Sequence, residues 1–320
     1  MSSTLAERHR DDGTPEGGQM TSAAVERFAA TVAGIERGTI RVLAGTALET
    51  ITLEPAHPSR DVFAVGDRVI VARARGQLRV VETLPRTSEL VRLRADRTRR
   101  SASAQRDAVL AANVETAVIV ASVSSPAFHP RLVDRYLVLC QYGGIAPLLC
   151  LNKCDLGGAS PDLSIYEGLD VPVVRCSTRT GAGLAELRSH LQGKTSVVTG
   201  HSGVGKSSLV NALSGEDVLP IGSVRASDGR GRHTTSSSRL TRLDAGTFVI
   251  DTPGIRSLGL WQVDPASLRF YFPEFDRFEA ACHFGDCTHS HEPGCAVKAA
   301  VEVGEIPAVR HASYLRMLDD

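Results

Sequence analysis

The spacing of hydrophobic residues changes along this chain, and the changes mark its units. From 34 to 87, short apolar stretches alternate with turn residues such as Gly45, Pro55 and Gly76. Several short strands separated by turns in this way are typical of a small β-barrel or sandwich. The predicted strands are 38–43, 50–53, 67–72 and 78–83.

Apolar runs in the next part of the chain alternate with segments of helical spacing. Within 130–142, Leu132, Val133, Tyr136 and Leu137 recur at helical intervals. Strands that alternate with helices indicate a parallel sheet with helices on both faces. The predicted strands are 115–123, 147–151, 171–175, 195–199 and 247–250, and the further predicted helices are 183–191 and 206–213.

These patterns divide the chain into segments of different character. The first has the mixed polar composition of a disordered tail and lacks the apolar stretch of a signal peptide. We expect this tail at 1–33, a β-barrel at 34–87, a basic linker at 88–106, an α/β domain at 107–262 and a small Cys/His-rich unit at 263–320. Because no run of about eighteen apolar residues occurs, we expect no membrane span.

Composition and charge indicate the class of protein, its cellular compartment and the kind of partner it binds. Hydrophobic residues make up 42% of the chain and charged residues 22%, which is ordinary for a globular protein. The seven cysteines are not spaced as a disulfide framework, which favours a reducing, cytoplasmic setting. The net charge is zero, but arginines gather in 86–106 and 225–242. These stretches predict an anionic partner, with solvated basic loops as the alternative.

A phosphate-binding loop is predicted between a strand and a helix. Its sequence, which fits G-x-x-x-x-G-K-[ST], is Gly200-His201-Ser202-Gly203-Val204-Gly205-Lys206-Ser207. Backbone N–H groups in such a loop turn toward phosphate oxygens, at the positive end of the helix dipole. Lys206 is expected to neutralise the β- and γ-phosphates, Ser207 to bind Mg²⁺, and Ser208 to reach the α-phosphate. This loop alone does not distinguish ATP from GTP.

The base is predicted to be guanine. The tetrapeptide Asn152-Lys153-Cys154-Asp155 follows an apolar strand directly, and the carboxyl ends of parallel strands are where α/β sheets bind ligands. The Asp155 carboxylate can accept the N1 and N2 hydrogens of guanine. Adenine offers neither, and rejection on that ground can reach roughly 10⁴-fold. Asn152 and the Lys153 stem would hold the base. Ser177 follows the next strand and is expected either to help bind the guanine or to form an ordinary turn.

A second phosphate-sensing segment is predicted at Asp251-Thr252-Pro253-Gly254, directly after a strand. Asp251 would meet Mg²⁺ through water, and the Gly254 N–H would meet the γ-phosphate. In an ordinary GTPase the phosphate loop comes first, whereas here it follows Asn152 and Ser177. The same sheet forms if the chain ends are joined and reopened elsewhere, so a circularly permuted order is expected. The segment after Asp251 then leads straight into the C-terminal unit.

The hydrolytic residues are predicted between these two phosphate-binding segments. Thr234 or Thr235 could close over Mg²⁺ in a glycine-containing switch, while the alternative is a mobile loop without a metal role. Ile255 occupies the place where many GTPases carry a water-orienting Gln. Unaided hydrolysis should therefore be slow, and His233 is the best candidate in this chain for positioning water.

A metal site is predicted near the C-terminus. Its ligands would be Cys282, Cys287, His289 and Cys295. Tetrahedral Zn²⁺ takes such a Cys₃His set, and a closed four-ligand shell is structural rather than catalytic. His283 and His291 are alternative nitrogen ligands, and a group of buried or redox-active cysteines is the alternative to a metal site.

Taken together, the motifs resemble those of the small-ribosomal-subunit biogenesis GTPases, the circularly permuted family often called RsgA or YjeQ. The resemblance runs from about 34 to 314. It is carried by 112–115, 134–137, 152–156, 200–211, 231–235, 251–254, 272–275 and the Cys/His cluster. Glu115 departs from the usual Asp of the family, and Thr178-Arg179 from the usual Ala-Lys.

The resemblance implies a multidomain fold with an N-terminal OB-fold barrel, a central α/β circularly permuted P-loop GTPase domain and a C-terminal zinc finger. It implies binding of GTP or GDP, Mg²⁺ and one structural Zn²⁺, with catalysis by His233, Thr234, Thr235 and Lys206. It also implies a cytoplasmic protein, monomeric off the ribosome and with no membrane partner. This protein would bind the small (30S) subunit and its rRNA late in maturation, and the subunit would stimulate its GTPase activity.

Two other functions are compatible with these motifs. One is a nucleic-acid-binding switch in which GTP only sets the affinity for RNA. The other is a permuted GTPase that acts on the large subunit, although such proteins usually lack both the barrel and this Cys₃His spacing.

Overall fold

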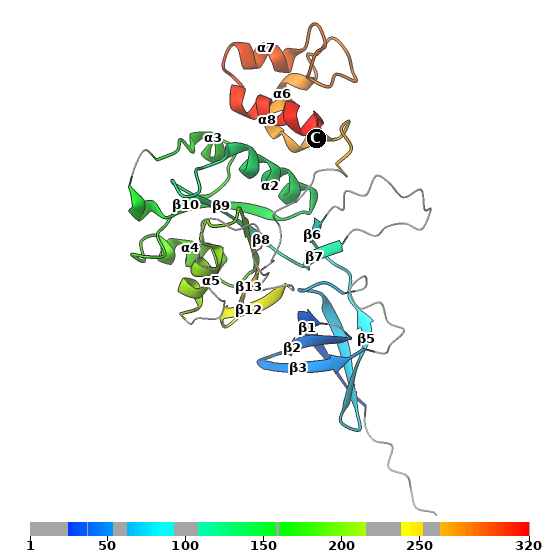
Figure 1. Cartoon of the computed structure of the whole chain (residues 1–320). Helices are drawn as coiled ribbons and strands as arrows, with labels where there is room; N and C mark the ends of the chain where they lie inside the picture. Colours follow the sequence, from blue (N-terminus) through cyan, green and yellow to red (C-terminus); the bar gives the residue numbers. More distant parts are fainter. Residues whose placement is uncertain are drawn as a thin grey trace, which may run out of the picture.

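The computed structural model describes residues 25–36, 38–53, 63–92, 108–157, 160–215, 238–251 and 263–319. They form three units in a row: a β-structure at the N-terminal end, an α/β domain in the middle and a small helical module at the C-terminal end (Figure 1). None of the helices in these ranges is long and apolar enough to cross a membrane.

The N-terminal unit consists of antiparallel strands folded around a core of their own. Its strands are β1 (Glu26–Glu36), β2 (Thr39–Ala44), β3 (Ala47–Thr52), β4 (Arg68–Ala74) and β5 (Gln77–Thr83). β1 pairs with β4 along its first half and with β2 along its second. The register shift between Val32 and Gly34 lies at this change of partner. Aliphatic side chains of β1 to β4, such as Val32, Ile40 and Val69, fill the interior.

The predicted boundaries of the first segments are wrong. The tail does not reach residue 33, because β1 begins at Glu26. The inward residues of its first half include Ala30, which contrasts too little with its polar neighbours to signal a strand. Residues 88–106 are not only a linker, since β6 (Glu89–Arg92) lies within them and pairs with β7 (Ala108–Ala112). Most of the basic part lies outside the described residues.

The central domain is a mixed sheet between two layers of helices. The strands run in the order β10 (Val173–Arg175), β9 (Ala146–Asn152), β8 (Thr116–Ser122), β11 (Thr195–Gly200), β13 (Thr247–Asp251) and β12 (Arg239–Asp244). All pair in parallel except β12, which is antiparallel to β13. The expectation of a purely parallel sheet is therefore wrong at this edge, where a hairpin turn replaces a helical crossover.

Two hydrophobic cores cover the two faces of this sheet. On one face, α2 (Pro130–Tyr142) and α3 (Ser164–Glu167) pack through residues such as Val133 and Tyr166. On the other, α4 (Leu184–Leu191) and α5 (Lys206–Ser214) pack through residues such as Leu187 and Leu209. Figure 1 shows the C-terminal module on the α2 side of the domain. α2 therefore lies between the sheet and that module.

The C-terminal module is made of short helices. They are η3 (Leu268–Tyr271), η4 (Pro273–Phe275), α6 (Asp276–Glu279), α7 (Ala296–Glu302) and α8 (Ala308–Asp319). In its interior Phe272 and Phe275 stack on each other and Tyr314 meets both edge to face, with ring centroids 5.1 to 5.3 Å apart. These aromatic rings join the core that lies over α2.

A tight junction connects the β-unit to the α/β domain at Gly66. The Gly66 N–H donates to the Val32 carbonyl at 2.8 Å, and the Gly66 carbonyl accepts from Asn113 Nδ2 at 2.9 Å. A Cβ atom on this residue would lie 2.0 Å from the carbonyl oxygen of Ala112, and its φ is +96°. Only glycine fits this position without a backbone shift.

We expect Gly66→Ala to lower the free energy of unfolding by about 3 kcal/mol, since it combines a left-handed conformation with a backbone clash. Gly76→Ala is the matched control, because Gly76 has a φ of +78° but nothing within 4 Å of its added Cβ. This control should lose only about 1 kcal/mol. Urea denaturation measures both, and equal losses would contradict the junction described here.

Candidate functional site

The strand register brings four loops to one edge of the sheet. Gly200 of β11 lies beside Val120 of β8, and Asn152 of β9 lies beside Ser122 of β8. β10 ends beside Leu151, the residue before Asn152, and β13 ends beside Val198, two residues before Gly200. The predicted phosphate, base and metal residues therefore follow strand ends that face the same way.

The loop from Gly200 to Gly205 encloses the start of α5. Gly205 precedes this helix with a φ of +97°, so the chain turns sharply before Lys206. Lys206 Nζ donates to the carbonyls of Gly200 and His201 at 2.9 and 2.8 Å. Ser207 and Ser208 lie in the first turn of the helix. The Lys206 ammonium group thus lies against the loop at the N-terminal end of α5, where the helix dipole favours an anion.

Asn152 and Lys153 are bonded directly to this phosphate loop. Asn152 Nδ2 donates to the Val204 carbonyl at 2.9 Å, and Lys153 Nζ donates to the Gly203 carbonyl at 2.6 Å. A Cβ on Gly205 would lie 2.5 Å from Asn152 Nδ2. The two motifs, about fifty residues apart and in reversed order, therefore form one continuous site.

Asp155 is held by the loop that follows β10. Ser177 Oγ donates to Asp155 Oδ1 at 2.6 Å, and it accepts from the N–H groups of Arg179 and Thr180, both at 3.2 Å. The Ser177 hydrogen bond is the largest of the effects that lower the pKa of Asp155. An ionised carboxylate offers only acceptors, as recognition of guanine N1–H and N2–H requires. Ser177 thus both forms a turn after β10 and holds Asp155.

Thr178 and Arg179, where the sequence departs from the family pattern, also contact this site. The Thr178 N–H donates to Asn152 Oδ1 at 3.4 Å, and Arg179 Nε lies 3.7 Å from Asp155 Oδ2. Cys154 is exposed, and its N–H bonds to the Cys176 carbonyl at 3.1 Å. Glu115, the other departure, accepts from the Thr195 N–H at 2.9 Å at the opposite ends of the strands. That contact fastens β8 to β11 away from the site.

Asp251 ends β13 half-buried. Burial raises the pKa of its carboxyl, and the charge of Lys206 opposes that rise. A carboxylate in this position gains from a nearby cation. The predicted residues Gly254, His233, Thr234 and Thr235 lie outside the described residues.

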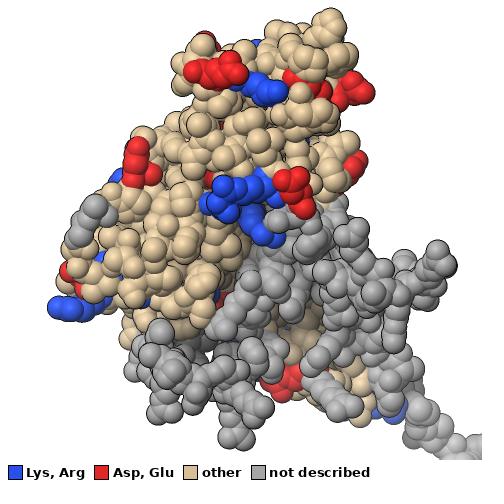
Figure 2. Space-filling model, turned by 45° about the horizontal axis from the view of Figure 1, so that its top comes forward, with Lys and Arg blue, Asp and Glu red and all other residues tan. Residues whose placement is uncertain are grey.

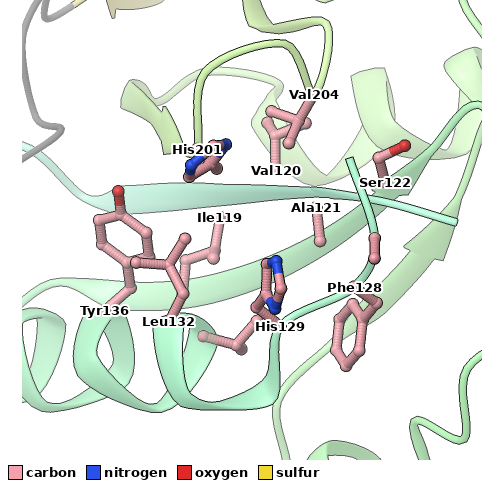
Figure 3. Close-up of a pocket in the computed structure, with 12 residues that line it drawn as sticks. Ile119, Val120, Ala121, Ser122, Phe128, His129, Leu132, Tyr136, His201 and Val204 are labelled. Carbon is pink, nitrogen blue, oxygen red and sulfur yellow. The ribbon is translucent and has the colours of Figure 1, made fainter. Parts of the chain in front are cut away.

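A pocket that the sequence did not predict lies between the phosphate loop and α2 (Figure 3). His201 and Val204 line it from the loop, and His129, Leu132 and Tyr136 line it from α2 and the residue before it. Burial raises the pKa of Tyr136. Tyr136 therefore lies at the boundary between α2 and the phosphate loop. Nothing in the helical spacing of 130–142 marks this position.

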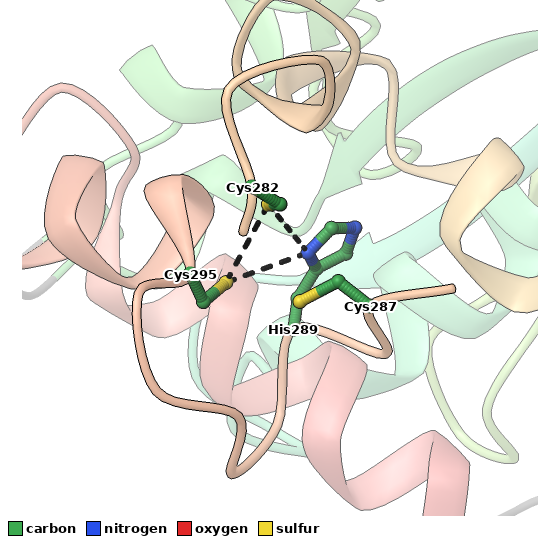
Figure 4. Close-up of side chains that lie close together, drawn as sticks. All are labelled: Cys282, Cys287, His289 and Cys295. Carbon is green, nitrogen blue, oxygen red and sulfur yellow. Dashed lines mark hydrogen bonds between the residues drawn. The ribbon is translucent and has the colours of Figure 1, made fainter. Parts of the chain in front are cut away.

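The four predicted metal ligands converge in the C-terminal module (Figure 4). Their ligand atoms all lie within 4.8 Å of one another. His289 Nδ1 is 3.7 Å from the Cys282 sulfur and 3.5 Å from the Cys295 sulfur, and these two sulfurs are 4.0 Å apart. Tetrahedral Zn–S bonds of about 2.3 Å would place sulfurs about 3.8 Å apart. The side chains therefore fit a tetrahedral ion.

The imidazole of this cluster is oriented by its surroundings. Its free nitrogen, Nε2, lies 3.2 Å from Glu279 Oε1, the carboxylate–histidine arrangement common around bound metals. The other two histidines have other partners: His283 meets Phe284 edge to face, and His291 bonds to Ser290 Oγ at 2.8 Å. Only His289 supplies nitrogen to the described cluster.

A phosphate loop and a guanine-type N-K-x-D loop on one sheet edge, in reversed order along the chain, define a circularly permuted P-loop GTPase. The family model "RsgA GTPase" matches residues 83–261. The chain belongs to the RsgA GTPase family and is a GTP hydrolase.

Individual relatives agree with this assignment. The small ribosomal subunit biogenesis GTPase RsgA of Chlorobaculum parvum is 42% identical over 267 residues, which cover 81% of this chain and 85% of that protein. The protein of the same name from Streptomyces avermitilis is 41% identical over 279 residues, or 84% of this chain and 72% of that one.

Solved structures show the same arrangement. YjeQ from Thermotoga maritima superposes with a TM-score of 0.70 at 30% identity, and the match covers 92% of this chain and 98% of that chain. YloQ, described as a circularly permuted GTPase, gives a TM-score of 0.68 at 25% identity over 94% of this chain and 97% of that chain.

The cluster predicts that His289→Ala abolishes metal binding, because three thiolates without the imidazole leave the shell open. Loss of a structural metal should cost several kcal/mol, about 3 or more, in the stability of the C-terminal module. His283→Ala is the matched control and should keep one metal ion per chain. Elemental analysis and thermal unfolding test this, and loss of metal from His283→Ala but not from His289→Ala would contradict the assignment.

Proposed function

We propose that this GTPase acts late in the maturation of the small (30S) ribosomal subunit, binds its rRNA, and hydrolyses GTP faster when bound there. The observation that carries the nucleotide part is the joining of Asp155, Asn152 and Lys206 around one continuous backbone surface. The names of the relatives support the ribosomal part.

Each residue at the edge has a role in this proposal. Asp155 accepts the two guanine hydrogens, and the Ser177 hydroxyl orients that carboxylate. Asn152, Lys153 and Cys154 form the wall of the base pocket. In the nucleotide-bound protein, Lys206 exchanges its bonds to Gly200 and His201 for phosphate oxygens, which the backbone from Gly200 to Ser208 surrounds.

A magnesium ion would sit between Ser207 and Asp251. Hydroxyl and carboxylate oxygens are hard ligands that suit Mg²⁺, and the ion would add positive charge beside the half-buried Asp251. When bound, the ion would supply positive charge that stabilises the negative charge of the phosphates. The Gly254 N–H would complete the γ-phosphate contacts.

Hydrolysis is assigned to the switch residues. His233 orients the attacking water in place of the Gln that Ile255 replaces, and Thr234 or Thr235 closes over the metal. Lys206 stabilises the charge that develops on the phosphates.

The outer units supply the contacts to the subunit. The five antiparallel strands of the N-terminal unit are consistent with an OB-fold, a common platform for RNA. The Cys₃His cluster suits one structural Zn²⁺, because three soft thiolates and an imidazole in a closed shell favour that ion. Cytoplasmic location and a monomeric state off the ribosome complete the proposal.

Surface charge supports the anionic partner only in part. Figure 2 shows Lys and Arg side chains near the middle of the visible face, with acidic residues beside them. Arg86, the first arginine of the basic stretch, is paired with the buried Asp67 at 2.6 Å and so stabilises the junction of the units. Most of the other arginines of 86–106 and 225–242 lie outside the described residues.

GTP turnover by the purified protein tests the proposal, with 30S subunits, with 50S subunits and with neither. We expect slow turnover alone, a rise of about tenfold or more with 30S, and no rise with 50S. His233→Ala should remove most of the 30S-dependent part and leave GDP affinity unchanged. Stimulation by 50S alone, or a rate with 30S no higher than background, would contradict the ribosomal assignment.

A further inference from the structure

We infer that Arg310, in the C-terminal module, is a positioning residue for the nucleotide site and acts on it through Asp134 and helix α2. The inference rests on the nucleotide-binding part of the proposed function and not on its ribosomal part.

Arg310 forms a buried ion triad between the module and α2. Its Nη1 donates to Asp134 Oδ1 at 2.6 Å, and its Nε and Nη2 donate to the two oxygens of Glu274 at 2.6 and 3.3 Å. The guanidinium carbon lies 4.5 Å from the centre of the Phe272 ring. Arg310 is 1% exposed and Asp134 0%. A buried charge that loses one partner is strongly penalised, so this contact holds α2 in a defined place.

The opposite face of α2 faces the phosphate loop. Tyr136 follows Asp134 by two residues, which is about 200° around a helix. Tyr136 is 3% exposed and lines one pocket with His201 and Val204 of the loop. Figure 3 shows Tyr136 and Leu132 on the helix side of the pocket and His201 on the loop side. One helix thus has the C-terminal module on one face and the phosphate loop on the other.

Hydrogen bonds near both ends of α2 link it further, one to the C-terminal module and one to the guanine loop. Near its C-terminal end, Gln141 Nε2 donates to the Phe270 carbonyl of the module at 3.3 Å. In the loop that precedes the helix, the Ser125 carbonyl accepts from Lys153 Nζ of the guanine loop. Packed helices move as units by small sliding steps. A change in how the module seats on α2 therefore changes the position of the loop that holds the phosphates.

Asp134→Asn and Glu274→Gln are a matched pair for testing this inference. Each removes one carboxylate charge from Arg310, but Glu274 belongs to the module and only Asp134 belongs to α2. We expect Asp134→Asn to raise the Kd for GDP about three- to thirtyfold. Glu274→Gln should change this Kd less than about twofold, which is the scatter expected for a residue that is not coupled to the nucleotide site. Titration with a fluorescent GDP analogue measures the Kd and the fraction of protein that binds.

A purely structural role would lower the binding fraction in both variants without moving the Kd. Equal Kd values for the two variants, or no change in Asp134→Asn, would overturn the inference. If Asp134→Asn does not fold, Arg310→Lys is tested instead. It keeps the buried positive charge but loses the planar guanidinium group that bonds both Asp134 and Glu274. A folded Arg310→Lys protein with wild-type Kd would likewise overturn it, whereas failure of the wild-type protein to bind GDP would overturn the proposed nucleotide site itself.

Discussion

The hydrogen bond from Asn152 Nδ2 to the Val204 carbonyl is the contact on which the site depends. It joins the base loop to the phosphate loop, and it leaves no room for a side chain at Gly205. The bond exists because β9 and β11 both run parallel to β8 and end near each other, opposite Ser122 and Val120. Chain order does not enter this geometry, so a permuted sequence can build the same edge. The permutation changes only which segments leave that edge and where they lead.

Those segments connect the nucleotide site to the C-terminal module. One route is the chain after Asp251, which continues toward the module. A second route is α2, held between Arg310 on one face and the phosphate loop on the other. The metal cluster rests on the same helix as Arg310: His311 Nε2 bonds to the His289 carbonyl at 2.8 Å, and the Tyr314 hydroxyl donates to the Thr288 carbonyl at 2.6 Å. A metal ion bound by His289 would therefore also restrict the motion of α8, the helix that carries Arg310.

Local signals predicted much of the fold and of the site. The helix 130–142 has the predicted bounds, because Pro130 suits its first turn and the apolar spacing is regular. The meeting of the Asn152 and Lys206 loops was predicted because each motif directly follows a recognisable strand. The separate Cys₃His cluster was predicted from the spacing of its own residues. β1 and β12 were missed because Ala, Thr and Arg residues blur their alternation, and α7 and α8 because the cysteine pattern dominated that region. The pair Asp134–Arg310 joins residues 176 positions apart, which no local pattern specifies.

A crystal structure of the protein with GDP and Mg²⁺ tests the central claim most directly. The account predicts guanine N1 and N2 about 2.7 to 3.2 Å from the Asp155 carboxylate, with the β-phosphate of the same molecule against Lys206 and the N–H groups of its loop. A nucleotide whose phosphates occupy that loop while its base lies away from Asp155, or one that binds at another edge of the sheet, would contradict it.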